Sequence, residues 1–388
     1  MNTVTVIGGG ASGLVAALTA AKENRVVLIE RQSRVGRKLL ATGNGRCNLT
    51  NTNPPEGHYH GNGAELACCL VRGFDELEFF RSLGLAVSEQ YGGRVYPLSD
   101  SAASVLDVLR FALDAAGVET VAGSPAKAVD FRDGSFNVIT GSRVITSDRL
   151  IVACGGKAGG KLGGVSDGYE ILSHFGHSCS RLYPALVPVY TEGDVTRSLK
   201  GVRAEAKVSL AGKTASGELQ FTERGVSGPA VFDLSRLAST DGGTMEISFI
   251  PEGEDILPVL LKRRQEMPAL EAGSILNGIL HSRLSMAVVK YSGLRPSESI
   301  GELSGKKLKE IAYNCEHFRL RIKGTASFDD AQVTAGGVNT AEFRPDTLES
   351  ILQPGLYACG EVLDVDGDCG GYNLRFAWAS GHLAGLLK

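Results

Sequence analysis

The sequence lacks the features that mark several large classes of protein. Its 388 residues carry a net charge of only −3 and no basic tract, so we expect neither a nucleic acid nor an anionic membrane as a partner. No segment has enough consecutive apolar residues to span a bilayer. The N-terminal apolar run has no basic region before it and is interrupted by glycines, unlike a signal peptide. We therefore expect a cytoplasmic protein that acts on a small-molecule substrate.

Paired cysteines and clusters of metal ligands are also missing. None of the eight cysteines stands in a CxxC pair, which argues against a disulfide scaffold. The short pairs His58-x-His60 and His174-x-x-His177 have no clustered cysteines or carboxylates beside them. Because a specific metal site needs several such ligands, the sequence predicts no metal centre.

Glycine, by contrast, is abundant, with 50 residues. Residues 3–7 predict a buried strand, residues 12–22 a helix and residues 26–29 a second strand. A GxGxxG fingerprint separates the first strand from the helix. In such a turn the three glycines permit a tight bend, close approach of a pyrophosphate and close packing of helix on strand.

The fingerprint consists of Gly8, Gly10 and Gly13, and Glu30 follows at the end of the second strand. The helix N-terminus offers free N–H groups to phosphates. A carboxylate at Glu30 can accept hydrogen bonds from both ribose hydroxyls of an adenosine and would repel a 2′-phosphate. The segment therefore predicts a dinucleotide site.

Two later strands also end at glycines, one at Gly155-Gly156 and one at Gly360-Glu361. Another glycine pair precedes a helix predicted over about residues 373–387, whose N-terminus could approach a polar ring edge. Glycine-rich strand ends that lie far apart in the sequence suit one long, extended ligand. FAD is such a ligand.

Four stretches carry a family resemblance: VIGGGASGLVAA, GRKLLATGNGRCNLTN, TAGGVNT and LYACGEVLDVDGDCGGYNLRFAWASG. They resemble the BaiN-like flavoproteins, bacterial NAD(P)/FAD-dependent oxidoreductases that include a bile-acid reductase and relatives described as aminoacetone oxidases. The resemblance covers residues 4 to about 386. It implies tightly bound, non-covalent FAD. Cys154 and Cys369 depart from the family pattern, in which threonine is more usual at both positions.

The resemblance also implies an α/β fold of the glutathione-reductase-like kind, a Rossmann FAD-binding domain interrupted by an insert. Alternating and then helical patterns in the middle of the chain agree with such an insert. We expect a first FAD-binding part over 1–190, a β-rich domain over 191–262, a small helical domain over 263–324 and a second FAD-binding part over 325–388.

The segment GRKLLATGNGRCNLTN, residues 36–51, is predicted to run along the cofactor and is called the strap below. The fingerprint, the strap and the resemblance together predict a set of cofactor-binding residues. These are Gly8, Gly10, Ala11, Ser12, Gly13, Glu30, Arg31, Arg37, Lys38, Gly43, Asn44, Gly45, Arg46, Cys47, Asn48, Ala126, Ala153, Gly155, Gly156, Gly360, Glu361, Gly371, Tyr372, Asn373 and Leu374.

Candidates for contact with the substrate are Arg46, Cys47 and Asn48 of the strap, together with Tyr372. Cys47 could be a redox thiol whose pKa is lowered by Arg46, or a structural or ligand-contacting cysteine. No partner cysteine stands nearby, which favours the second interpretation. Tyr372 could be a proton donor or a packing group.

The chain has no second GxGxxG motif, so an NAD(P)H donor would bind only transiently. We expect an FAD-dependent oxidoreductase that uses NAD(P)H to reduce an activated C=C bond of a small organic substrate of the steroid or bile-acid type. The alternative is an aminoketone oxidase that releases peroxide. A third class, an FAD-binding protein that acts on RNA, is disfavoured by the balanced charge. The sequence identifies neither the substrate nor the electron donor nor the oligomeric state.

Overall fold

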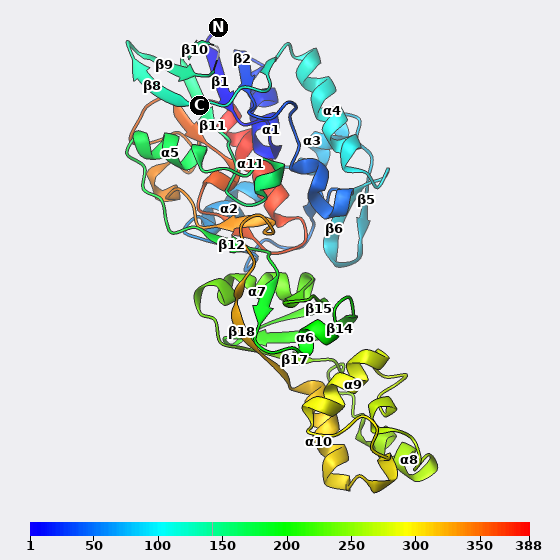
Figure 1. The fold of residues 1–388 in the computed structure, drawn as a ribbon. Coiled ribbons are helices and arrows are strands. Elements are labelled where there is room, and N and C mark those ends of the chain that lie inside the picture. The colour runs from blue at the N-terminus through cyan, green and yellow to red at the C-terminus, as the bar shows by residue number, and fades with distance from the viewer. Residues whose placement is uncertain (142) are drawn as a thin grey trace. The chain divides into compact units, whose positions relative to one another are not determined.

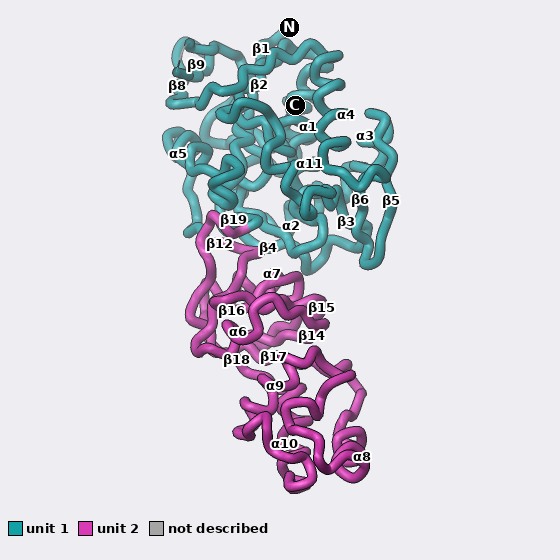
Figure 2. The backbone as a smooth tube through the Cα atoms, turned by 45° about the vertical axis from the view of Figure 1, so that its right-hand side comes forward, with its two compact units in different colours: residues 1–183, 332–388 teal, residues 184–331 magenta. Residues whose placement is uncertain are grey.

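The computed structural model describes residues 1–141 and 143–388. The chain forms two compact units, which Figure 2 colours separately. Unit 1 comprises residues 1–183 and 332–388, and unit 2 comprises residues 184–331. Within the described ranges, no helix is both long enough and apolar enough to cross a membrane.

Unit 1 is built on a parallel five-stranded sheet with the order β20-β11-β1-β2-β7. Its central strands are rich in Val, Ile and Leu and are buried, as strands covered on both faces must be. Helix α1 (Ala11–Ala20) connects β1 to its neighbour β2, which confirms the predicted strand, turn, helix and strand. The strands are β1 (Thr3–Ile7), β2 (Arg25–Ile29), β7 (Glu119–Val121), β11 (Arg149–Val152) and β20 (Leu356–Ala358).

The C-terminal helix α11 (Tyr372–Gly385) packs along α1 (Figure 1). A Cβ atom at Gly381 would lie 2.3 Å from the carbonyl oxygen of Ser12, and one at Gly385 would lie 2.6 Å from that of Ala16. The second contact lies four residues after the first in both α1 and α11, so the two helices run in the same direction. The N-terminus of α11 therefore extends beyond that of α1 by about eight residues, or roughly 12 Å at 1.5 Å per residue.

Smaller elements complete unit 1, including the antiparallel sheets β10-β9-β8, β3-β6-β5 and β21-β4. The further strands are β3 (Thr50–Asn51), β4 (Tyr59–His60), β5 (Val87–Gln90), β6 (Arg94–Pro97), β8 (Ala128–Arg132), β9 (Ser135–Ile139), β10 (Val144–Ser147) and β21 (Asp366–Gly367). The further α-helices are α2 (Ala64–Arg72), α3 (Glu76–Ser82), α4 (Ala102–Ala115) and α5 (Asp167–His174). The chain passes between the units near β12 (Tyr183–Ala185) and β19 (Val333–Ala335).

Unit 2 contains a closed barrel with the strand order β13-β16-β15-β14-β17-β18. Its strands are β13 (Val189–Thr191), β14 (Arg203–Leu210), β15 (Lys213–Phe221), β16 (Gly225–Ser227), β17 (Thr244–Ser248) and β18 (Phe318–Thr325). Along the chain, α6 (Val195–Ser198) follows β13 and α7 (Pro229–Thr240) follows β16. The segment that connects β17 to β18 contains α8 (Leu257–Glu266), α9 (Ser282–Tyr291) and α10 (Gly305–Glu316). Because β13 pairs with β18 to close the barrel, the domain boundaries predicted after residues 190 and 324 pass through paired strands.

Candidate functional site

The fingerprint turn has one open position between two crowded ones. Gly8 has a φ of 109°, and a Cβ there would lie 2.3 Å from the carbonyl oxygen of Ala153. A Cβ at Gly13 would lie 1.8 Å from the carbonyl oxygen of Gly8, whereas one at Gly10 would meet nothing within 4 Å. The first and third glycines thus pack β1, β11 and α1 together. The second leaves space at the start of α1, where free N–H groups can receive a phosphate.

The carboxylate of Glu30 is held beside this turn. Its Oε2 accepts a hydrogen bond from the backbone N–H of Gly9 at 2.8 Å, and its Oε1 accepts one from that of Gln32 at 2.7 Å. Each carboxylate oxygen keeps lone-pair capacity for another donor. The half-buried Glu30 is therefore oriented to bind the hydroxyls of a ribose next to the phosphate position.

Lys38 and Glu361 join the strap to the end of β20. Lys38 Nζ lies 2.8 Å from Glu361 Oε2, and Glu361 Oε1 accepts a hydrogen bond from the backbone N–H of Thr334 at 2.8 Å. A Cβ at Gly156 would lie 2.5 Å from Glu361 Oε1, so glycine is needed for this approach. Three predicted residues from distant segments thus meet.

The strap bends through left-handed backbone. Positive φ angles occur at Gly43 (57°), Asn44 (57°), Gly45 (86°) and Cys47 (61°). Glycine and asparagine tolerate this conformation well, whereas cysteine adopts it rarely. The side chain of Cys47 is fully buried, and burial raises the pKa of its thiol to about 12. Because the thiol is desolvated, these observations favour the structural or ligand-contacting interpretation of Cys47 over a redox thiol activated by Arg46.

Arg46 contacts side chains around β5 and β6. Its guanidinium lies 4.2 Å from the ring centroid of Tyr96, its Nε lies 2.5 Å from Asp100 Oδ1, and its Nη2 lies 3.2 Å from Gln90 Oε1. These contacts engage the charged end of the side chain. They support a role for Arg46 in fixing the strap, and its contact with a substrate stays a prediction.

The side-chain oxygen of Asn48, a hydrogen-bond acceptor, lies beside the start of α11, whose backbone N–H groups are donors. Asn48 Oδ1 is buried and has no hydrogen-bond partner among the residues that the structure describes. A Cβ at Gly371 would lie 3.0 Å from this oxygen. The first N–H groups of a helix have no intrahelical acceptor, and in α11 they begin at Tyr372. A flavin pyrimidine edge, with one N–H between two carbonyl groups, matches this set of donors and acceptor.

Tyr372 and Asn373 are engaged by their surroundings. The ring of Tyr372 is 3% exposed and stacks on His58 with 4.2 Å between centroids. Asn373 Oδ1 accepts a hydrogen bond from the N–H of Gly367 at 2.8 Å, and its Nδ2 donates to the carbonyl oxygen of Gly367 at 2.7 Å. The side chain of Asn373 therefore holds β21, and only its backbone can serve a ligand at the helix start. The contacts of Tyr372 favour the packing interpretation.

Two of the predicted cations, Arg31 and Arg37, are paired with side chains of the protein, and their contact with a cofactor stays a prediction. Arg31 Nη1 lies 3.1 Å from Asp167 Oδ2, and Arg37 Nη1 donates to Gln32 Oε1 at 2.7 Å. Both pairs are solvent-exposed. The remaining predicted residues lie at the ends of β11 and β20, at the starts of α1 and α11, or, for Ala126, in the loop before β8; they are Ala11, Ser12, Ala126, Ala153, Gly155, Gly360 and Leu374.

Sequence reasoning missed the residues that hold the strap against α11. Trp378 Nε1 donates to the carbonyl oxygen of Leu49 at 2.8 Å. The buried carboxylate of Glu76 accepts a hydrogen bond from Thr50 Oγ1 at 2.5 Å, and its Oε1 lies 3.3 Å from Arg375 Nε. An acidic residue in the first turn of a helix is usually a surface residue, so no local pattern marks Glu76 as buried.

The chain matches the family model described as HI0933-like protein Rossmann domain over residues 2–387. It is 39% identical to the 3-dehydro-bile acid delta(4,6)-reductase of Clostridium scindens, over 99% of this chain and 98% of that protein. It is 30% identical to the ribosomal RNA dihydrouridine synthase of Escherichia coli, over 97% of this chain and 95% of that protein.

Solved structures share the fold at low sequence identity. One is the open conformation of a flavocytochrome c3 fumarate reductase, with a TM-score of 0.51 and 15% identity, covering 99% of this chain and 77% of that one. Another is the 3-ketosteroid delta1-dehydrogenase from Sterolibacterium denitrificans in complex with 1,4-androstadiene-3,17-dione, with a TM-score of 0.50 and 13% identity, covering 100% and 99%. The predicted Rossmann-type α/β fold is confirmed.

Proposed function

The chain belongs to the HI0933-like Rossmann family and is an FAD-dependent oxidoreductase, and from this premise we propose that it uses NAD(P)H to reduce a carbon–carbon double bond conjugated to a carbonyl group. The expected resemblance to the BaiN-like flavoproteins is confirmed by the 39% identity to the bile-acid reductase. The substrate class and the donor are the parts that we propose.

The observation that carries the proposal is the pair of helix starts that face the same way. The start of α1 offers N–H groups beside Glu30 and the open space at Gly10. The start of α11 extends further by roughly 12 Å along the helix axis and offers N–H groups beside the unpartnered oxygen of Asn48. This spacing supports a ligand with a nucleotide at one end and a polar ring edge at the other, as in FAD.

FAD supplies the hydride-transfer chemistry, and the chain supplies binding and electrostatics. The N–H groups and dipole at the start of α11 would stabilise negative charge on the ring edge. Glu30 would bind the ribose, and Lys38 lies where the strap meets Glu361. Burial and the raised pKa of the Cys47 thiol support a structural role for this residue rather than a part in electron transfer.

The proposed substrate class follows from the chemistry that the names of two relatives have in common. A 3-dehydro bile acid with delta(4,6) unsaturation has double bonds conjugated to a carbonyl group, and so has the uracil ring that becomes dihydrouridine. We propose the same bond type for this chain, in a small organic compound of the steroid or bile-acid type. The identity of 39% to the bile-acid reductase, against 30% to the rRNA enzyme, supports the small molecule.

Ribosomal RNA is the second candidate substrate, because the two dihydrouridine synthases align over nearly the whole chain. Neither unit carries the net positive charge that would favour RNA as the substrate. Unit 1 carries 21 Lys and Arg against 24 Asp and Glu, and unit 2 carries 19 of each. Proteins that bind RNA backbones commonly carry an excess of basic residues on the binding face.

The test is a substrate panel with the purified flavoprotein and NADH or NADPH under nitrogen. The panel contains a 3-oxo-4,6-diene bile acid, 2-cyclohexen-1-one, unmodified rRNA and, in air, aminoacetone. We expect NAD(P)H consumption coupled to a product heavier by two hydrogens with the unsaturated ketones. Reduction of rRNA alone would move the assignment to the nucleic acid, and peroxide released from aminoacetone alone would establish the oxidase.

A further inference from the structure

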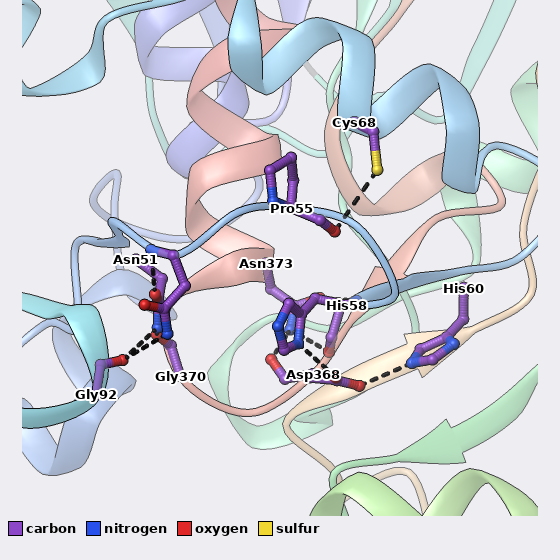
Figure 3. A network of polar contacts seen from close by, with 11 residues as sticks. Asn51, Pro55, His58, His60, Cys68, Gly92, Asp368, Gly370 and Asn373 are labelled. Atoms are coloured by element: carbon purple, nitrogen blue, oxygen red, sulfur yellow. Dashed lines mark hydrogen bonds and ion pairs between the residues drawn. The ribbon is translucent and has the colours of Figure 1, made fainter.

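A carboxylate flanked by two histidines lies where β4 pairs with β21 (Figure 3). Asp368 Oδ2 lies 2.9 Å from His58 Nδ1, and Asp368 Oδ1 lies 2.7 Å from His60 Nε2. His58 directly precedes β4 and His60 is its last residue, and both rings approach the same carboxylate. We call these three residues the His–Asp–His cluster.

The cluster is fixed to the first turn of α11. The ring of His58 stacks on that of Tyr372, with centroids 4.2 Å apart and an interplanar angle of 16°. The backbone N–H of Asp368 donates to the carbonyl oxygen of His58 at 2.9 Å, and Tyr59 Oη donates to the carbonyl oxygen of Tyr372 at 3.0 Å. The same helix turn offers its N–H groups beside Asn48, so the cluster adjoins the proposed ring-binding end.

The histidines of the cluster are more exposed to solvent than its carboxylate. The side chains of His58 and His60 are 37% and 36% exposed, whereas that of Asp368 is 20% exposed. A molecule at the surface can therefore reach an imidazole while the carboxylate stays behind it. Because Nδ1 of His58 faces Asp368, the ring is oriented and its Nε2 is the nitrogen left for a substrate.

A metal site does not explain the arrangement. The two imidazoles approach different oxygens of Asp368 with hydrogen-bond distances. Among residues 1–141 and 143–388, no three His, Cys, Asp or Glu side chains gather as metal ligands. The geometry is that of imidazoles oriented by a carboxylate, as in general acid–base catalysis.

Reduction of a conjugated double bond requires a proton as well as a hydride. We propose that His58 is the catalytic acid that supplies this proton, with Asp368 and His60 as positioning residues; the inference rests on the proposed function. The hydride, originating from NAD(P)H, bonds to the β-carbon and the C=C π bond breaks. The Nε2–H bond of the His58 imidazolium then breaks as a C–H bond forms at the α-carbon, and water restores the proton to the ring.

Several ionisable groups surround the cluster on the elements that pack against β4. Tyr59 lies between the two histidines on β4 itself. The others are Asp366 of β21, Tyr372 and Arg375 of α11, and Glu65, Cys68, Cys69 and Arg72 of α2. His58 must carry a proton to act as an acid, and these are its ionisable neighbours on the elements that pack against β4.

The experiment separates proton donation from a merely structural clamp. His58→Gln and Asp368→Asn keep side chains of similar size, and the exposed His174→Gln on α5 is the matched control. Flavin content, the visible spectrum and bleaching by NADPH are measured first, and then reoxidation by 2-cyclohexen-1-one and by a 3-oxo-4-ene bile acid under nitrogen. We expect His58→Gln to keep flavin content and bleaching within about twofold of wild type and to slow reoxidation by about 100-fold or more, the usual range for a general acid.

Further outcomes are equally defined. We expect Asp368→Asn to slow reoxidation less than His58→Gln, with bleaching by NADPH near the wild-type rate in both variants. Reoxidation of His58→Gln at the wild-type rate would overturn the inference, and so would a parallel loss of flavin and of both half-reactions. If wild type itself is bleached but no unsaturated ketone reoxidises it, the proposed function fails and the inference fails with it.

Discussion

The indole Nε1 of Trp378 donates a hydrogen bond to the carbonyl oxygen of Leu49 at 2.8 Å, although the two residues stand 329 positions apart. Trp378 is fully buried, so this contact is shielded from water. It fixes the end of the strap against α11, the helix whose start lies beside Asn48. The position of Asn48 Oδ1 therefore depends on both ends of the chain.

Asn48→Leu should weaken the retention of FAD. The substitution removes the unpartnered acceptor at the start of α11, and a lost hydrogen bond of this kind costs about 1–3 kcal/mol, or roughly 5- to 150-fold in Kd. Equilibrium dialysis or flavin fluorescence measures the change. Asn44→Leu should also weaken retention, because a Leu is strained at a φ of 57°, whereas Asn44→Gly should not. Unchanged flavin affinity in Asn48→Leu would contradict this account of the strap.

Substitutions of Gly13 and Gly10 should affect folding and cofactor binding differently. Gly13→Ala places a Cβ 1.8 Å from the carbonyl oxygen of Gly8, so we expect a large fall in Tm together with loss of flavin. Gly10→Ala meets nothing within 4 Å in the protein, so the Tm of the flavin-free form should stay near that of wild type while FAD affinity falls. Thermal unfolding of flavin-free protein and flavin titration measure the two effects. Full FAD binding by Gly10→Ala would place the phosphates elsewhere.

Glu76→Ala should be strongly destabilising. It leaves Arg375 and Thr50 without their buried partner, and a buried donor left unsatisfied typically costs about 1–3 kcal/mol, more when the donor is charged. Urea denaturation measures the loss. Glu76→Gln keeps an acceptor for Thr50 and should cost less, and the exposed Glu78→Ala on the same helix is the control.

Glu76 should also make the free energy of unfolding depend on pH. Burial raises the pKa of this carboxyl above its ordinary value of 4.5, so the folded protein keeps a proton that the unfolded chain has lost. The stabilisation from this group is complete below the ordinary pKa and is lost as the pH rises through the folded one. The stability difference between wild type and Glu76→Gln should therefore shrink from acidic toward neutral pH. A difference that grows over this window would contradict the assignment.

Cys47 should be inert in the native protein. Because burial raises the pKa of its thiol to about 12, iodoacetamide at about pH 8 should modify the exposed Cys69 and leave Cys47 unmodified until the protein unfolds. Mass spectrometry of the alkylated peptides reports both sites. Cys47→Ala should keep bleaching by NADPH, and rapid native labelling of Cys47 would restore the redox interpretation.

The fold was largely predictable because its signals are local. The fingerprint glycines, the apolar strand residues 3–7 and the acid Glu30 stand within thirty residues of one another. The contacts that complete the site are not local. Glu76 meets Arg375, and His58 meets Asp368, across about 300 residues, and nothing in single-sequence spacing reports such pairs. Arg46 shows the same limit, because it stands beside Cys47 in the sequence while its guanidinium contacts Tyr96 and Asp100 from more distant positions.

The central claim is that this chain carries FAD and passes a hydride from NAD(P)H to a conjugated carbon–carbon double bond. Anaerobic stopped-flow spectroscopy of the flavoprotein tests it most directly, with reduction by NADH or NADPH followed by mixing with a 3-oxo-4,6-diene bile acid. The account predicts that the visible absorbance of the oxidised flavin bleaches with one of the two donors and returns on mixing with the unsaturated ketone, with a reduced product. A protein that cannot be loaded with FAD, or a reduced flavin that only oxygen reoxidises, would contradict it.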